Sequence, residues 1–180
     1  MNLTRRRFLE ACGLAAATIG GVAATGCSSS KSVPPTFPER DLARVLIDEM
    51  AAEEKAAQLF IVTPEQISGT ELSLGVDDAF REGLQARPVC GLTYFDGNII
   101  DSAQISTMLA DTQAVASELG MTPPFLCVDE EGGTVQRIGG KPGFDAPFIG
   151  DARDIGATGD VAMARETART IAIALRDLGF

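Results

Sequence analysis

Three consecutive acids stand at the end of an apolar run, in the segment FLCVDEEGGTVQR (125–137). They are Asp129, Glu130 and Glu131; two glycines follow them, and Arg137 closes the segment. Crowded carboxylates push one another's pKa values apart, which is a frequent mark of a functional site. A carboxylate can accept hydrogen bonds from two hydroxyls of one ligand, and an arginine supplies a planar fork of donors. Asp129 and Arg137 together therefore suit a polyhydroxylated ligand.

Three other interpretations compete for the same acids. The first is a solvated acidic turn that Arg137 neutralises. The second is a metal site, but side chains alternate along a strand, so three consecutive acids cannot all face one ion, and Mg²⁺ or Ca²⁺ would need ligands from other loops. The third is a phosphate cradle, which the acids would repel and which lacks a lysine in the P-loop position. We therefore expect neither a metal nor a cofactor.

The elements that must position these residues alternate between strands and helices. Helical spacing of apolar residues predicts helices over 39–50, 76–87, 101–119 and 160–179, with a short turn of helix at 51–58. Short apolar runs predict strands at 59–62, 89–95 and 123–129. The stretches 63–75 and 132–159 are expected to be loops. The predicted fold class is α/β.

Strands that are apolar on both faces are typical of a parallel sheet covered by helices. Two architectures fit this order: a doubly wound open sheet and a (β/α)8 barrel. In both, functional residues lie at the carboxyl ends of the strands. Asn98 follows the second predicted strand and Asp129 ends the third, so both are candidate site residues.

Composition excludes several functions. The chain has 180 residues, of which 45% are apolar, which is enough for one ordinary domain with a core. Its net charge of −10 argues against nucleic acid as a partner, because phosphates would be repelled. It contains no histidine, so no histidine of this chain can act as acid, base or metal ligand.

The N-terminus has the features of an export address. Thr4–Leu9 (TRRRFL) resembles a twin-arginine signal, and the apolar run at 11–24 is too short and too weakly hydrophobic for a stable membrane span. The following ATGC box resembles a lipoprotein cleavage site, although Ala24 stands where leucine is preferred. Cys27 would then be lipidated, which predicts an exported protein anchored to the membrane in the cell envelope. The alternative is an ordinary cleaved signal with an incidental cysteine.

These features divide the chain into three parts, which are the signal at 1–27, a Ser/Pro-rich tether at 28–38 and the folded domain at 39–180. Within the domain, Cys90 and Cys127 fall on predicted strands. We expect them to be buried free thiols rather than a disulfide, because twin-arginine cargo folds in a reducing compartment.

The segment VDEEGGTVQR (128–137) resembles the signature of glycoside hydrolase family 3, in its β-N-acetylhexosaminidase branch, which has the form D-[EQ]-E-G-G-x-V-Q-R. Three flanking segments resemble that family in the same order: MAAEEKAAQLFIV (50–62), CGLTYFDGNI (90–99) and FDAPFIGDARDIGATGD (144–160). The resemblance covers about residues 40–180.

The resemblance implies the N-terminal portion of a (β/α)8 TIM barrel and an N-acetylglucosamine-containing glycan as partner. Asp129 and Arg137 match positions that hold the sugar through its hydroxyls. Glu131 would shape the loop or pair with Arg137, and Asn98 would sit at the rim of the same face. Whether the natural glycan is a cell-wall fragment or a chitin-type oligosaccharide stays open, as does the oligomeric state.

The resemblance also implies which catalytic groups to expect. Retaining hydrolysis needs a nucleophilic carboxylate and a proton donor. In this family branch both lie downstream of the residues present here, so no catalytic residue is expected in this chain. We expect a truncated β-N-acetylhexosaminidase that is inactive alone. The alternative is a non-catalytic surface lipoprotein that acts as a sugar-binding or interaction module.

Overall fold

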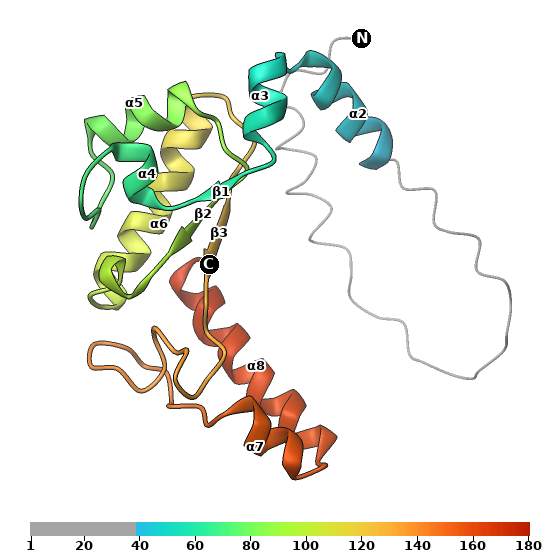
Figure 1. The fold of residues 1–180 in the computed structure, drawn as a ribbon, viewed down its shortest axis with the longest axis vertical. Coiled ribbons are helices and arrows are strands. Elements are labelled where there is room, and N and C mark those ends of the chain that lie inside the picture. Colours follow the sequence, from blue (N-terminus) through green and yellow to red (C-terminus); the bar gives the residue numbers. More distant parts are fainter. Residues whose placement is uncertain (1–38) are drawn as a thin grey trace, which may run out of the picture. The chain divides into compact units, whose positions relative to one another are not determined.

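The computed structural model describes residues 39–180, which fall into two units with a boundary after Lys55. The described part of the first unit carries α2 (Glu39–Glu49) and the start of α3 (Ala52–Ala57). Both helices lie where the sequence predicts them (Figure 1). The predicted signal and tether lie outside the described residues.

The second unit is built on a parallel sheet of three strands in the order β1-β2-β3. The strands are β1 (Ile61–Val62), β2 (Gly91–Tyr94) and β3 (Phe125–Val128). Gly91 of the central strand pairs with Ile61 on one side and with Phe125 on the other. The predicted α/β class and the parallel pairing are confirmed, although each strand is shorter than its apolar run.

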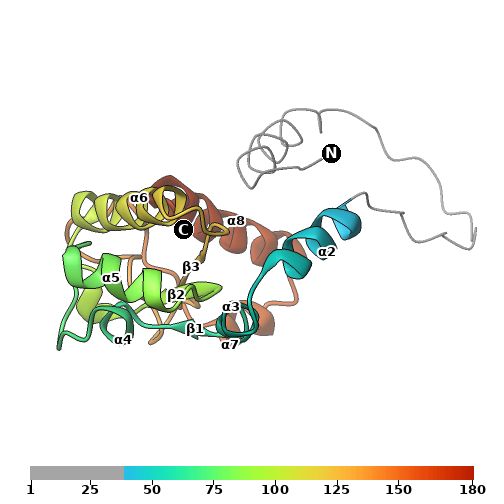
Figure 2. The ribbon, with the colours of Figure 1, turned by 90° about the horizontal axis from the view of Figure 1, so that it is seen from above.

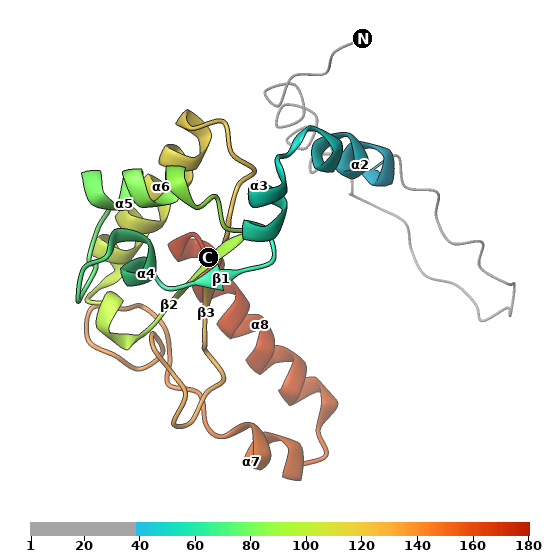
Figure 3. The same ribbon diagram turned by 45° about the horizontal axis from the view of Figure 1, so that its top comes forward.

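The remaining elements are α4 (Pro64–Ser68), α5 (Asp78–Ala86), η1 (Asp96–Asn98), α6 (Ser102–Glu118), α7 (Ala152–Ala157) and α8 (Val161–Leu178). The last of these runs back toward the sheet, as Figure 3 shows. The helices α5, α6 and α8 confirm the predicted ones. The short helices α4 and α7 lie where the sequence predicts loops, so that prediction was wrong at these two places.

Local chemistry explains why α4 forms. The Thr63 side chain accepts a hydrogen bond from the backbone N–H of Gln66, and the Gln66 side chain accepts one from the N–H of Thr63. Pro64 occupies the first turn, and Gly69 ends the helix in a left-handed conformation with φ 73°. A helix of five residues is too short to display a hydrophobic period, which is why the sequence pattern missed it.

The core lies between the sheet and the helices α4, α5 and α6, which gather on one side of it (Figure 1). Phe80, Leu84, Leu92, Tyr94 and Ile105 are among its fully buried members. The C-terminal turn of α8 packs against α6 (Figure 2), and Leu175 and Leu178 reach the same core.

Some large apolar side chains near β1 and β3 remain exposed. Leu59 is 82% exposed, Phe60 58% and Phe125 70%. No element of the described residues covers these side chains. None of the helices within residues 39–180 is long and apolar enough to cross a membrane.

Candidate functional site

The loops that follow the three strands meet at one edge of the sheet, because parallel strands end on the same side. The loop after β2 is tied to its neighbours by two contacts. Asn98 donates a hydrogen bond to Glu65, on the helix that follows β1. Lys141, on the segment that follows β3, forms an ion pair with Asp96. Side chains distant in sequence thus join the strand-end loops into one layer.

Asn98 is a buried residue that hydrogen-bonds to the neighbouring loops. Its side chain is 2% exposed and its amide also donates to the Ser73 carbonyl at 3.0 Å. Its carbonyl oxygen accepts from the Phe95 N–H at 2.9 Å. The sequence placed Asn98 at the rim as a candidate sugar contact, whereas the structure engages both ends of its side-chain amide within the protein. Its observed role is to join the loops after β1 and β2.

Glu65 is stabilised in its charged form by this arrangement. Burial acts to raise its pKa, but several hydrogen bonds act against burial, including those from the Ser73 N–H and the Asn98 amide. Together they lower the pKa of Glu65 below its usual value.

Glu130 organises the loop after β3. One of its carboxylate oxygens accepts hydrogen bonds from the backbone N–H groups of Arg137 at 2.7 Å and Ile138 at 3.0 Å. The other accepts from the Gly139 N–H at 2.9 Å. Sequence reasoning assigned loop shaping to Glu131 and gave Glu130 no role. Successive side chains of an extended backbone point in opposite directions. This alternation could have predicted that Glu130 points away from Asp129 and Glu131.

The side chains of Asp129 and Arg137 form no ion pair among the described residues. Asp129 is exposed at the end of β3. The Arg137 side chain is half-buried, and its Nε atom is buried with no hydrogen-bond partner. Among the ion pairs of residues 39–180, none joins Arg137 to Asp129, Glu130 or Glu131. The pairing of Arg137 with Glu131, one of the two roles expected for Glu131, is therefore not formed, and no ion pair within residues 39–180 neutralises the acidic turn.

Gly132 and Gly133 make the sharp turn between these residues. Their φ angles are 89° and 59°, a left-handed region that side chains rarely adopt. The Glu131 N–H donates to the Val135 carbonyl at 2.8 Å, and the Gly133 N–H donates to the Ile149 carbonyl at 2.8 Å. A Cβ on Gly132 would lie 2.7 Å from the Gly150 carbonyl oxygen. The turn is therefore packed closely against the segment that precedes α7.

Two hollows lie near this loop. The first, of about 360 Å³, is lined by Glu131, Thr134, Asp151, Arg153 and other residues of the turn and of α7. Glu131 thus faces a hollow with other acids nearby.

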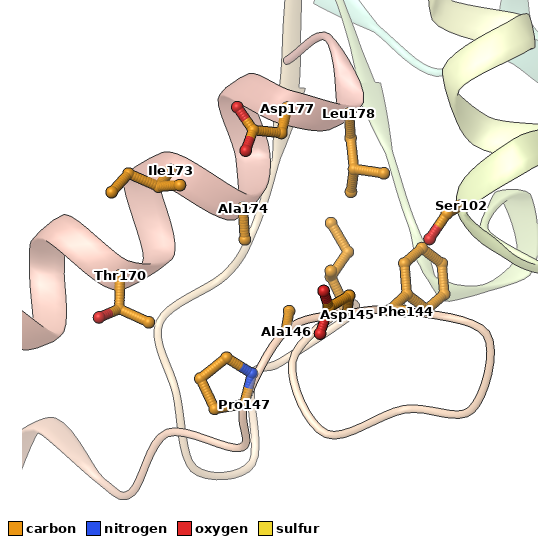
Figure 4. Close-up of a pocket in the computed structure, with 11 residues that line it drawn as sticks. Ser102, Phe144, Asp145, Ala146, Pro147, Thr170, Ile173, Ala174, Asp177 and Leu178 are labelled. Atoms are coloured by element: carbon orange, nitrogen blue, oxygen red, sulfur yellow. The ribbon is translucent and has the colours of Figure 1, made fainter.

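The second hollow, of about 350 Å³, lies between α8 and the loop that contains Phe144 and Pro147 (Figure 4). Its Ser102 hydroxyl donates to the Gly143 carbonyl at 2.7 Å, and its Asp177 carboxylate accepts from Arg176. None of the predicted sugar-binding residues lines it.

The cysteines and the acids define no further site. Cys90 and Cys127 are free thiols, as predicted, but they are half-buried rather than buried; burial raises the pKa of Cys127. Within the described range, no group of three acids or thiols is placed to hold a metal ion.

Comparisons with known proteins agree with the signature in the sequence. No family model matches the chain. A β-hexosaminidase of Xanthomonas campestris pv. campestris is 32% identical over 119 residues, which are 63% of this chain and 32% of the relative. A β-hexosaminidase of Xanthomonas axonopodis pv. citri is 36% identical over 80 residues, which are 44% of this chain and 21% of the relative.

Solved structures show the same relationship. A glycoside hydrolase family 3 β-N-acetylglucosaminidase from Paenibacillus sp. strain FPU-7 superposes with a TM-score of 0.63 at 27% identity, covering 73% of this chain and 23% of that one. A fungal multi-domain β-N-acetylglucosaminidase of the same family has a TM-score of 0.61 at 22% identity. The match covers 72% of this chain and 14% of that one, and it supports the fold alone. The chain spans about a third of the length of its Xanthomonas campestris relative. Over part of its length, the chain is distantly similar to the β-N-acetylglucosaminidases and β-hexosaminidases of glycoside hydrolase family 3.

Proposed function

We propose that this chain supplies the sugar-binding loops of a β-N-acetylhexosaminidase that removes terminal β-linked N-acetylglucosamine by retaining hydrolysis. The observation that carries the proposal is that two side chains without an ion-pair partner follow β3. Asp129 is exposed, and the buried Nε of Arg137 has no hydrogen-bond partner. A buried donor without a partner is costly, so the Arg137 guanidinium has hydrogen-bonding capacity that the described residues do not use.

The chemistry of the two side chains suits a sugar. The Asp129 carboxylate accepts hydrogen bonds from two neighbouring hydroxyls, and the Arg137 guanidinium donates to sugar oxygens in one plane. Glu131 remains a weaker candidate contact, because it faces the hollow with Asp151. The proposal assigns no residue of this chain to the nucleophile or the proton donor.

We also propose that the sheet is the first part of a (β/α)8 barrel. The parallel order β1-β2-β3, with helices between the strands, supports this architecture. So does the exposure of Phe60 and Phe125, since further strands and helices of a closed barrel would cover such side chains.

For its location, we propose export and lipid anchoring through Cys27 in the cell envelope. The support is the sequence alone, namely the arginine run at 5–7 and the ATGC box.

Titration of the purified chain with N-acetylglucosamine, followed by nuclear magnetic resonance, tests the proposed sugar contacts. We expect Asp129→Ala or Arg137→Ala to weaken binding by about 10-fold to 100-fold, because a hydrogen bond to a charged group is worth about 1.5–3 kcal/mol. Both variants should keep the melting temperature, since neither side chain fills the core.

Arg165→Ala is the matched control for this titration, because Arg165 is an exposed arginine on α8. Unchanged binding in the Asp129 and Arg137 variants, or a lower melting temperature with unchanged binding, would show that these residues stabilise an acidic turn instead. Glucose in place of N-acetylglucosamine tests whether the site distinguishes the two sugars.

A further inference from the structure

Glu130 is the only side chain of the acidic triplet that hydrogen-bonds within the described part of the chain, and all its bonds go to one stretch of backbone. The three consecutive N–H groups of Arg137, Ile138 and Gly139 converge on its carboxylate at 2.7–3.0 Å. Successive backbone N–H groups that converge in this way form a concave anion-binding site. Here the anion is a side chain of the same loop.

This arrangement ties the two ends of the candidate sugar site together. Glu130 is the direct neighbour of Asp129 in the chain, and its carboxylate binds the backbone N–H of Arg137. The positions of the exposed acid and of the arginine therefore depend on one charged residue between them. No other side chain of the described residues hydrogen-bonds to the Arg137 backbone N–H, which has Glu130 as its acceptor.

Other contacts hold the residues around Arg137. The Gln136 side-chain amide donates to the Pro147 carbonyl at 3.4 Å and accepts from the Ile149 N–H at 3.3 Å, and Ile138 is buried in the core. The turn is closed further up by the Glu131–Val135 backbone pair and by the bond from the Gly133 N–H to the Ile149 carbonyl. Glu131, Gly133 and Val135 precede Arg137 in the chain, whereas Ile149 follows it. The next backbone restraint after Gly139 is the Gly140 N–H, which donates to the Ala146 carbonyl at 2.8 Å. Within the described residues, the bond to Glu130 is the one hydrogen bond of Arg137 itself, while its neighbours Gln136 and Ile138 are held by other contacts.

We infer that Glu130 is a positioning residue, which presents the Arg137 guanidinium to the sugar without touching the sugar itself. The inference rests on the proposed function, because it takes Arg137 as a sugar contact. The inference predicts that removing the Glu130 carboxylate weakens sugar binding while the domain stays folded. The loss of sugar affinity should increase with the number of backbone N–H groups left without an acceptor.

Two substitutions separate the carboxylate's hydrogen bonds from its bulk. Glu130→Ala removes both acceptor oxygens and with them all three hydrogen bonds. Glu130→Gln keeps the shape and one acceptor oxygen, which serves Arg137 and Ile138, but turns an NH2 group toward the Gly139 N–H. Glu82→Ala is the matched control, since Glu82 is an exposed glutamate on α5, away from the site.

The experiment measures N-acetylglucosamine affinity, melting temperature and amide hydrogen exchange on the full chain and these variants. We expect Glu130→Ala to bind about 10-fold more weakly or worse, Glu130→Gln to fall between it and the parent chain, and Glu82→Ala to match the parent. Exchange should accelerate at residues 137–139 in Glu130→Ala and stay unchanged in α5 and α6. The Arg137 Nε–H resonance should shift or broaden in the same variant.

The outcomes distinguish the inference from the proposed function. If Arg137→Ala weakens binding but Glu130→Ala does not, the inference is overturned and the proposed function stands. If the parent chain does not bind N-acetylglucosamine, the proposed function falls first, and the inference with it. If Glu130→Ala accelerates exchange throughout the domain, Glu130 is a general stabilising residue and the inference is overturned. Should Glu130→Ala not fold, Glu130→Gln carries the same comparison.

Discussion

The ring of Tyr94, at the end of β2, meets the ring of Phe180 edge-on, with centroids 5.9 Å apart and planes at 78°. Tyr94 is fully buried, and its hydroxyl lies 3.3 Å from the Thr112 hydroxyl. The contact brings the last residue of the chain onto the central strand. It also seals the environment of the only tyrosine in the sequence.

The titration of this tyrosine provides the first prediction. Burial raises the pKa of Tyr94 to about 12. Because the sequence has one tyrosine, ultraviolet absorbance of tyrosinate reports this residue alone. The folded pKa is raised, so its contribution to stability is fully present below the unfolded pKa of about 10 and is lost as the pH rises through 12.

Phe180→Ala tests the cause of the shift. Removal of the ring admits water to Tyr94, so the pKa should fall toward about 10. Phe148→Ala, which truncates a phenylalanine that is 66% exposed, is the control. A titration near pH 10 in the parent chain would show that Tyr94 is not sealed from water.

The second prediction concerns Asn98. Asn98→Ala leaves the Ser73 carbonyl and the Phe95 N–H without their partner inside the protein. Unsatisfied buried groups cost about 1–3 kcal/mol each, so urea unfolding should show a loss of about 2–4 kcal/mol. Gln85→Ala, at an exposed amide on α5, should change the free energy of unfolding little. Unchanged stability in Asn98→Ala, together with weaker sugar binding, would restore Asn98 as a sugar contact.

The third prediction concerns the glycine turn. Gly132→Ala would force a side chain into a left-handed conformation and against the Gly150 carbonyl, so we expect a loss of roughly 2 kcal/mol or more. Gly150→Ala is the control, because a Cβ there meets nothing within 4 Å. Thermal unfolding of the two variants makes the comparison, and equal melting temperatures would contradict the close packing of the turn.

The fourth prediction concerns Cys27, which lies outside the described residues. Mass spectrometry of the membrane fraction should find a diacylglyceryl group on this cysteine, and Cys27→Ala should move the protein out of that fraction. Cys12→Ala is the control, since Cys12 precedes the predicted cleavage site. A Cys27→Ala protein that stays equally membrane-bound would rule out the anchor.

Local signals in the sequence were enough to predict the parallel α/β arrangement and the place of the acidic turn. Apolar runs and helical spacing are local signals, so they located β2, β3, α5, α6 and α8 without knowledge of their partners. Since parallel strands end at one edge, the pattern also placed Asp129 and Asn98 on the same layer of loops.

The contacts of each polar side chain in these loops depend instead on long-range packing. The acceptor of Asn98 lies 33 residues away on α4, and the acid partner of Lys141 lies 45 residues away, so no local pattern encodes either contact. Glu130 and Glu131 have the same chemistry and differ only in direction: one meets three backbone N–H groups and the other faces a hollow. The directions of these two side chains depend on the backbone geometry after β3, where Gly132 and Gly133 adopt left-handed conformations.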